Sequence, residues 1–148
     1  MIVSAIIAIC IVGMFMALDA AVTGTEGDKL PEAIERIDPS RSATQTPAQT
    51  QVFVDLQSGY TGVLIIDGLE LETVDLDALR GETKPGQQIK LPPTTVYEPG
   101  NATLSFGPTE GSSIEEFSQG EHLVQVVYWK VTEGRGKARS FTWTFSVF

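Results

Sequence analysis

The sequence has few of the residues on which catalytic and metal sites most often depend. It contains one cysteine, Cys10, and one histidine, His122, among 148 residues. A single cysteine excludes an intramolecular disulfide, and a single histidine excludes any site that needs two imidazoles. Nucleophilic triads need a base beside a serine or cysteine, and the sequence has no Walker loop, dinucleotide fingerprint or zinc-ligand spacing. We therefore predict a protein that is not an enzyme and has no cofactor.

The chain is also poor in positive charge. Ten Lys and Arg residues stand against nineteen Asp and Glu residues, which gives a formal net charge of −9 at pH 7 and a sequence pI of about 4.5. Proteins that bind nucleic acid need a basic face, so we expect no nucleic-acid partner.

Four of the ten basic residues nevertheless lie within residues 130–139. We take the loop TEGRGK and its flank, with Arg135, Lys137 and Arg139, as the candidate interaction loop for an anionic or acidic partner. The plainer interpretation is an exposed turn whose charges keep a sheet edge soluble. Loops carry binding more often than strands do, and RGETKPGQQ at residues 80–88 is the second candidate loop.

The first eighteen residues, MIVSAIIAICIVGMFMAL, carry no charge. As an α-helix they would reach about 27 Å, close to the roughly 30 Å thickness of the hydrocarbon layer. We predict a transmembrane helix over residues 1–20. The alternatives are a cleaved signal peptide, although Leu18-Asp19-Ala20 is a poor cleavage match and no basic segment precedes the apolar run, and a lipoprotein modified at Cys10, although Ile9 stands where a small residue is required.

Residues 21–45 are predicted to form a linker, because they are rich in Gly, Thr, Pro and charge. Within the linker, DKLPEAIERI predicts a short helix near residues 30–37. Leu30, Ile34 and Ile37 would share one face of that helix, and Pro31 suits its first turn.

From about Gln51 the apolar residues alternate with a period of two, as they do in strands. About seven such segments, separated by Gly and Pro turns, predict an all-β sandwich over residues 46–148. In the last segment, RSFTWTFSV, the alternation predicts that four side chains face the core: Phe141, Trp143, Phe145 and Val147.

Two polar features of this region have structural and functional interpretations. His122 follows Gly120 at the start of a strand, and we expect its ring to bond backbone groups at a corner rather than to act as a base or metal ligand. Five acidic residues crowd the segment DGLELETVDLD: Asp67, Glu70, Glu72, Asp75 and Asp77. A calcium loop would use such carboxylates, but the EF-hand spacing is absent and we expect a solvated acidic face.

Several segments resemble parts of bacterial immunoglobulin-like domains. IEEFSQGEHLVQVVYWKV followed by RSFTWTFSV resembles their closing hairpin, in which a Gly-x-His or similar corner leads into a Val-rich strand. IDPSRSATQTPAQTQVFVDL resembles their entry, and YTGVLIIDGLEL one of their strand-turn-strand units. The resemblance covers about residues 37–148, and an anchor followed by one such domain resembles uncharacterised actinobacterial envelope proteins. It implies an immunoglobulin-like β-sandwich, here without the Cys pair of antibody-type domains.

The orientation of the predicted helix follows from the domain rather than from flanking charge. Cytoplasmic flanks of membrane helices are rich in Lys and Arg, and the basic residues closest to the helix, Lys29, Arg36 and Arg41, all follow it. Alone they favour an N-terminus outside the cell. The resemblance implies the opposite orientation, with the C-terminal domain extracytoplasmic, and we adopt it.

The sequence thus predicts a single-pass protein of the cytoplasmic membrane that serves as an interaction or scaffolding module of the cell envelope. Its partner, a protein or an envelope component, is not identified. One alternative is an accessory subunit that docks in a membrane complex through its helix, where Ala5, Ala8 and Gly13 permit close packing. A small hydrolase is a further alternative, disfavoured because a sandwich of about 100 residues offers little cleft.

Overall fold

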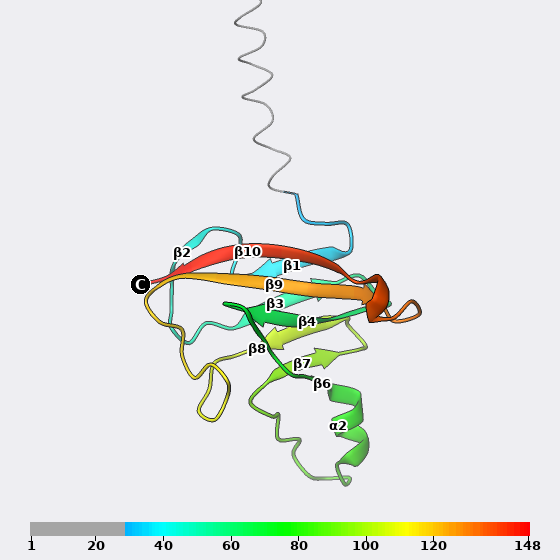
Figure 1. The fold of residues 1–148 in the computed structure, drawn as a ribbon. Helices are drawn as coiled ribbons and strands as arrows, with labels where there is room; N and C mark the ends of the chain where they lie inside the picture. Colours follow the sequence, from blue (N-terminus) through cyan, green and yellow to red (C-terminus); the bar gives the residue numbers. More distant parts are fainter. Residues whose placement is uncertain (1–28) are drawn as a thin grey trace, which may run out of the picture. The chain divides into compact units, whose positions relative to one another are not determined.

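Residues 29–148 are described by a computed structural model, and they contain a two-layer β-sandwich (Figure 1). Residues 31–148 form one compact unit. The predicted transmembrane helix over residues 1–20 lies outside the described part of the chain. Between residues 29 and 148, no helix is long and apolar enough to cross a membrane.

Each sheet has five strands. The first has the order β1-β3-β8-β7-β6 and comprises β1 (Ile34–Asp38), β3 (Val52–Leu56), β8 (Thr103–Phe106), β7 (Thr95–Glu98) and β6 (Thr73–Asp75). The second has the order β2-β10-β9-β4-β5 and comprises β2 (Ala43–Thr46), β10 (Arg139–Val147), β9 (Gly120–Lys130), β4 (Tyr60–Ile66) and β5 (Leu69–Glu70). A short helix, α2 (Leu76–Glu82), follows β6, and a 3-10 turn, η2 (Arg135–Lys137), precedes β10.

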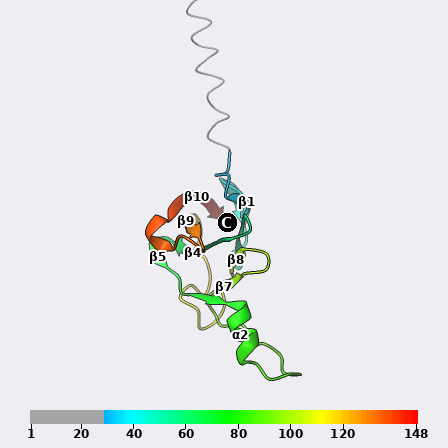
Figure 2. The same cartoon turned by 90° about the vertical axis from the view of Figure 1, so that its right-hand side faces the viewer.

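The two sheets lie face to face, as the end-on view in Figure 2 shows. The chain changes sheets early: β1 pairs with β3 in the first sheet, whereas β2 runs parallel to β10 in the second. The cis peptide bond Asp38-Pro39 lies in the short connection between β1 and β2. This strand order is consistent with an immunoglobulin-like fold, and the predicted all-β sandwich is confirmed.

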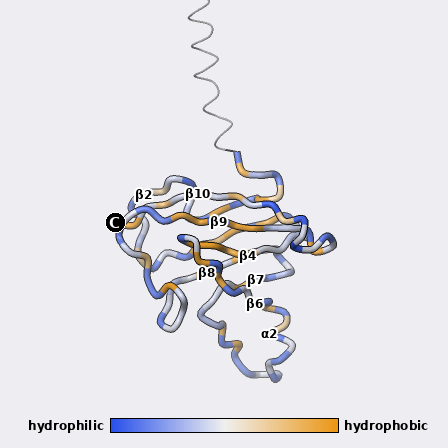
Figure 3. Tube along the Cα trace, in the orientation of Figure 1, coloured by the Kyte–Doolittle hydropathy of each residue, from blue (hydrophilic) through white to orange (hydrophobic). Residues whose placement is uncertain are grey.

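The core lies between the sheets because the main strands alternate buried with partly exposed side chains. Hydrophobic residues gather along β4 and β9 at the centre of the second sheet (Figure 3). The largest fully buried side chains are those of Phe106, Phe145, Leu56, Leu64, Ile66, Leu104, Val52, Val54, Val124, Val126 and Thr95. With no disulfide, packing of these side chains supplies the main stabilisation.

The last strand faces the core as predicted. Trp143, Phe145 and Val147 are buried, and the indole Nε1 of Trp143 donates a hydrogen bond to the carbonyl oxygen of Pro39 at 3.0 Å. Phe141 is only half-buried: its ring stacks on Trp143 at 5.8 Å, and the guanidinium of Arg41 lies 4.9 Å from its centroid. The alternation therefore continues through Phe141, but at that residue the core opens to solvent.

The helix predicted near residues 30–37 is wrong. The amide of Ile34 donates to the carbonyl of Pro31 in a turn at 2.8 Å, and strand β1 begins at Ile34 and pairs with β3. An isolated helix this short is marginal, whereas a β-branched residue packs well on a sheet. The sandwich therefore begins at β1, and the linker predicted over residues 21–45 extended too far into the domain.

Candidate binding site at one end of the sandwich

Strand β9 runs the length of the second sheet, and its inward side chains meet different surroundings at its two ends. Val124 and Val126 are fully buried at its middle, His122 is buried near its start and Tyr128 near its end. In Figure 1, β9 runs from the C-terminal side of the sandwich towards η2. We call the start of β9 the histidine end and the end of β9 the open end.

At the histidine end, both ring nitrogens of His122 face hydrogen-bond acceptors. Nδ1 lies 2.7 Å from Oδ2 of Asp67, and Nε2 lies 2.7 Å from the carbonyl oxygen of Ser118. A neutral imidazole has only one N–H and donates to only one of them. The geometry therefore fits a doubly protonated ring that donates to both.

The surroundings of His122 act on its pKa in opposite directions. Burial of the ring lowers the pKa of His122. The hydrogen bonds to Asp67 and Ser118 and the negative charge of Asp67 raise the pKa by more, so the net shift is upward. The ring lies 5.0 Å from Phe117 and 5.5 Å from Phe145, measured between centroids. Since both nitrogens are engaged, His122 has no free atom with which to bind a substrate or a metal.

The expected role of His122 as a corner residue is confirmed at Ser118, but its carboxylate partner was not predicted. Asp67 lies in the turn after β4, where the second carboxylate oxygen, Oδ1, accepts from the amide of Leu123 at 2.9 Å. The amide of Asp67 donates in return to the carbonyl of Leu123 at 2.8 Å. Asp67-Gly68 was a visible turn signal, but nothing in the sequence pointed from that turn to a histidine 55 residues away.

The crowded acidic residues are not brought together. Glu70 pairs with Arg135 at 2.8 Å and Asp77 with Arg80 at 3.0 Å, while Asp75 caps helix α2. Among the described residues, no group of three His, Cys, Asp or Glu is placed to hold a metal ion.

The three residues of the candidate interaction loop are divided between two places. Arg135 lies above the Trp129 ring, 5.7 Å from its centroid, and its ion pair with Glu70 raises the pKa of Arg135 and lowers that of Glu70. Lys137 and Arg139 instead line a cavity that contains Tyr128. The structure brings Lys137 and Arg139 together and leaves Arg135 outside that cavity.

The sheet register explains how cations gather at the open end. Tyr60 is the register partner of Lys130, and Arg139 is the partner of Tyr128. Directly opposed residues in an antiparallel pair point to the same face, and Lys130 is two residues from Tyr128. All four therefore point to the inner face of the second sheet. We call this group, together with Lys137, the cationic mouth.

The residues of the cationic mouth line two cavities. Four residues line both of them: Tyr60, Tyr128, Lys130 and Arg139. The first, of about 290 Å³, also has Trp129, Glu133 and Lys137 in its wall. The second, of about 330 Å³, extends to the first sheet, where it is lined by Pro31, Glu32, Ala33 and Gln57. The two cavities adjoin at the four residues that line both, and we refer to them together as the groove.

Within the described part of the chain, the cations of the mouth lack carboxylate partners. Throughout residues 29–148, no carboxylate lies within 4.0 Å of the charged nitrogens of Lys130, Lys137 or Arg139. Arg139 is the register partner of Tyr128; burial raises the pKa of Tyr128, and the charge of Arg139 acts against that rise. The phenol therefore remains protonated at neutral pH and can donate a hydrogen bond.

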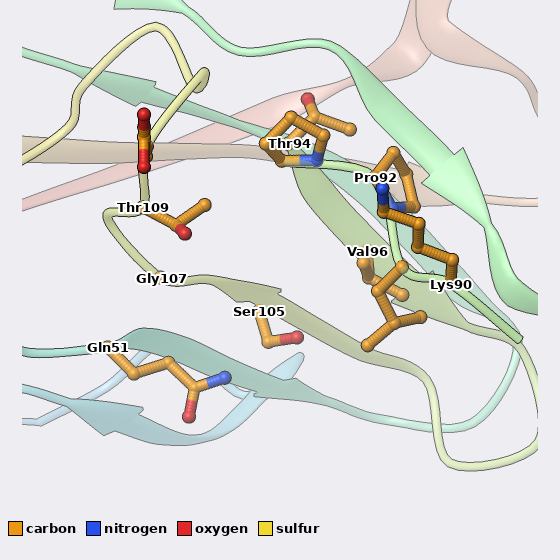
Figure 4. Close-up of a pocket in the computed structure, with 11 residues that line it drawn as sticks. Gln51, Lys90, Pro92, Thr94, Val96, Ser105, Gly107 and Thr109 are labelled. Carbon is orange, nitrogen blue, oxygen red and sulfur yellow. The ribbon is translucent and has the colours of Figure 1, made fainter.

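A further cavity, of about 400 Å³, lies beside β7 and β8 and is shown in Figure 4. Lys90 and Pro92 lie on one side of it and Thr109 on the other. Its wall contains one lysine and one glutamate but no aromatic ring. No residue of the second candidate loop, residues 80–88, lines it. The cationic mouth, which has both aromatic rings and unpaired charge, is therefore our candidate site.

Comparison with known proteins adds a likeness of fold. No known family model matches the chain, and no curated protein matches it in sequence. Among solved structures, residues covering 77% of this chain are similar to 90% of the chain in the crystal structure of CopC from Methylosinus trichosporium OB3b, with 14% sequence identity and a TM-score of 0.44.

Proposed function

We propose that the chain is a membrane-anchored, extracytoplasmic interaction module of the cell envelope that binds its partner at the cationic mouth and catalyses no reaction. The observation that carries the proposal is the set of three cations, Lys130, Lys137 and Arg139, held beside two tyrosines without a carboxylate partner in the described structure.

The arrangement of these charges supports binding rather than stability. Lys130 and Arg139 extend from neighbouring strands towards one groove, and like charges that share a groove repel each other. The rest of the chain is strongly acidic, with a net charge of −9 for the whole sequence. A partner that brings negative charge into the mouth would relieve this repulsion, which gives binding an electrostatic driving force.

The absence of catalysis is proposed from the chemistry of the mouth. Its walls contain no serine, cysteine or histidine, and the single histidine is fully hydrogen-bonded at the histidine end. Glu32 and Glu133 line different cavities of the groove, so they do not form a pair of carboxylates around one site. A binding surface therefore needs fewer assumptions than an active site.

The place in the cell is proposed from the sequence. Eighteen uncharged residues at the start of the sequence are long enough for a membrane span, and the sandwich that follows is typical of domains presented outside the cytoplasm. This arrangement would hold the mouth within reach of other envelope components.

Site-specific photo-crosslinking of the full chain in its native membranes tests the proposal. A benzophenone side chain would replace Lys137 at the mouth or, as a matched control, Glu121, which is exposed at the histidine end. We expect a discrete crosslinked product from position 137 only, and it should survive exchange of residues 1–20 for an unrelated membrane helix. Equal products from both positions, or loss of the product after the exchange, would contradict a mouth-based module; the latter result would favour an accessory subunit.

A further inference from the structure

We infer that the cationic mouth binds an acidic saccharide, meaning a hydroxylated sugar ring that carries a carboxylate or phosphate group. The inference rests on the proposed function and names the chemical class of its ligand. Three features of the groove lead to it: its unpaired cations, its aromatic wall and its two carboxylates.

The cations provide the site for the anionic group. Arg139 presents a planar guanidinium with several donors, which suits the two oxygens of a carboxylate or phosphate. Lys130 lies on the adjacent strand and faces the same groove. Neither has a carboxylate within 4.0 Å among residues 29–148, so an incoming anion would not have to displace an internal partner.

The aromatic side chains provide a surface for a ring. The centroids of Tyr60 and Tyr128 lie 6.1 Å apart and their planes are inclined by 57°, and both residues line the two cavities. Aromatic faces carry partial negative charge and accept weak hydrogen bonds from C–H groups, such as those on the less polar face of a sugar. The tyrosine hydroxyl groups both donate and accept hydrogen bonds, which suits the hydroxyl groups of a saccharide.

The two carboxylates distinguish a saccharide from a polyanion. Glu133 lines the first cavity and Glu32 the second. Each carboxylate accepts hydrogen bonds and would repel additional phosphate groups. A ligand with one acidic group and several hydroxyls satisfies both kinds of residue, whereas an anionic bilayer surface or a polyphosphate would meet unfavourable charge from Glu32, Glu133 and the acidic chain as a whole.

The size of the groove limits the ligand. Its two adjoining cavities measure about 290 and 330 Å³. Sites for small molecules are commonly about 300–1,000 Å³. The groove therefore suits one or two sugar units, either as a free oligosaccharide or as the end of a longer chain.

Calorimetric titration of the full chain in neutral detergent tests this inference. The probe is trigalacturonic acid, and the neutral galactose trisaccharide is its control. We expect binding of the acidic probe only, with weaker affinity at high salt. Arg139→Gln and Lys130→Gln should each weaken binding about tenfold, since charge-assisted hydrogen bonds are the strong ones.

Matched variants and competing probes decide the result. Arg80→Gln removes a cation from helix α2, away from the residues of the mouth, and should leave binding unchanged; each variant's melting temperature shows whether it is folded. Equal binding of the neutral trisaccharide, or acidic binding that survives Arg139→Gln and Lys130→Gln together, would overturn the inference.

Two outcomes separate the inference from the proposed function. If a polyglutamate peptide or phosphatidylglycerol vesicles bind through Arg139 and trigalacturonic acid does not, the ligand class is wrong but the mouth is still an interaction site. If trigalacturonic acid binds as expected but the crosslink from position 137 is absent in native membranes, the saccharide inference holds and the proposed engagement of an envelope partner fails.

Discussion

The two ends of strand β9 place charged side chains on the same face of the same sheet, with opposite results. At the histidine end, His122 is enclosed by two aromatic rings and both of its nitrogens meet acceptors. At the open end, Lys130 and Arg139 lie beside tyrosine rings, and no carboxylate of the described chain is within 4.0 Å of either.

The difference separates charge that stabilises the fold from charge that is available to a ligand. A buried imidazolium without acceptors would be strongly destabilising, so the histidine end has to be complete within the domain. The cations of the open end remain in contact with water and need no internal partner. Each of the following predictions tests whether the two ends differ in this way.

The largest expected effect comes from two phenylalanines four residues apart on the same face of β10. Phe145 is fully buried at the histidine end, and Phe145→Ala should reduce the free energy of unfolding by about 3–5 kcal/mol. Phe141 is half-buried towards the open end, and Phe141→Ala should cost roughly 1–2 kcal/mol. Urea denaturation of both variants gives the comparison, and equal losses would mean that the core is no tighter at the histidine end.

Removal of the carboxylate that holds His122 is the next largest effect. Asp67→Ala leaves Nδ1 of His122 and the amide of Leu123 without their acceptor and should cost about 1–3 kcal/mol of unfolding free energy. Glu121→Ala, which removes an exposed carboxylate one residue from His122, should stay within about 0.5 kcal/mol. If denaturation shows the same loss for both, Asp67 acts only through the overall charge.

The protonation of His122 predicts how stability depends on pH. Because the folded-state pKa is raised above the unfolded value of about 6.5, protonation stabilises the fold. This contribution is fully present below the unfolded pKa and is lost as the pH rises through the folded pKa. Denaturation from pH 5 to 9 should show that decline, with a shallower slope in Asp67→Asn; stability that rises across this range would show that the ring is neutral in the fold.

The smallest effect on stability is expected at the open end. Arg139→Gln removes an exposed cation that has no ion-pair partner within residues 29–148, so the free energy of unfolding should change by no more than about 0.5 kcal/mol. A gain in stability at low salt would agree with relief of repulsion from Lys130. A loss above about 1 kcal/mol in the same denaturation assay would place Arg139 among the residues that hold the fold together.

Most of the second sheet could be predicted from the sequence. The period-two pattern from Phe141 to Val147 and from Leu123 to Tyr128 assigned inward and outward positions, because each strand has one buried face and one partly exposed face. Turn signals at Asp67-Gly68 marked the end of β4. In these strands the alternation in the sequence matches the packing in the fold, so the pattern alone was enough to predict which side chains face the core.

Elements whose structure depends on distant partners could not be predicted. Ile34 and Ile37 have the spacing of a helical face, and only pairing with β3 makes that segment a strand. Strand β7, with Thr95 fully buried, lies in a segment with little apolar alternation. Helix α2 was missed because its seven residues bury no side chain and begin at a cap, where Asp75 accepts from the amides of Asp77 and Ala78.

The sequence indicated only some of the residues that form the candidate site. The clustering of Arg135, Lys137 and Arg139 in the sequence indicated the loop beside the candidate site. Spacing along the chain does not show which of these cations share a groove. Tyr60 joins the site because it is the register partner of Lys130, 70 residues along the chain. Arg135 is not part of the site because its guanidinium is paired with Glu70.

The parallel pairing of β2 with β10 has a mechanical consequence. A force that draws Ser42 and Phe148 apart pulls β2 from its first residue and β10 from its last, so the two strands slide in opposite directions along their common axis. Bonds at both ends of the pair, from Ser42 to Thr144 at 2.8 Å and from Phe148 to Thr46 at 3.4 Å, are then loaded together rather than in turn. We expect single-molecule pulling between these ends to give a higher rupture force than pulling across β4 and β5, whose antiparallel bonds open one after another from a shared turn.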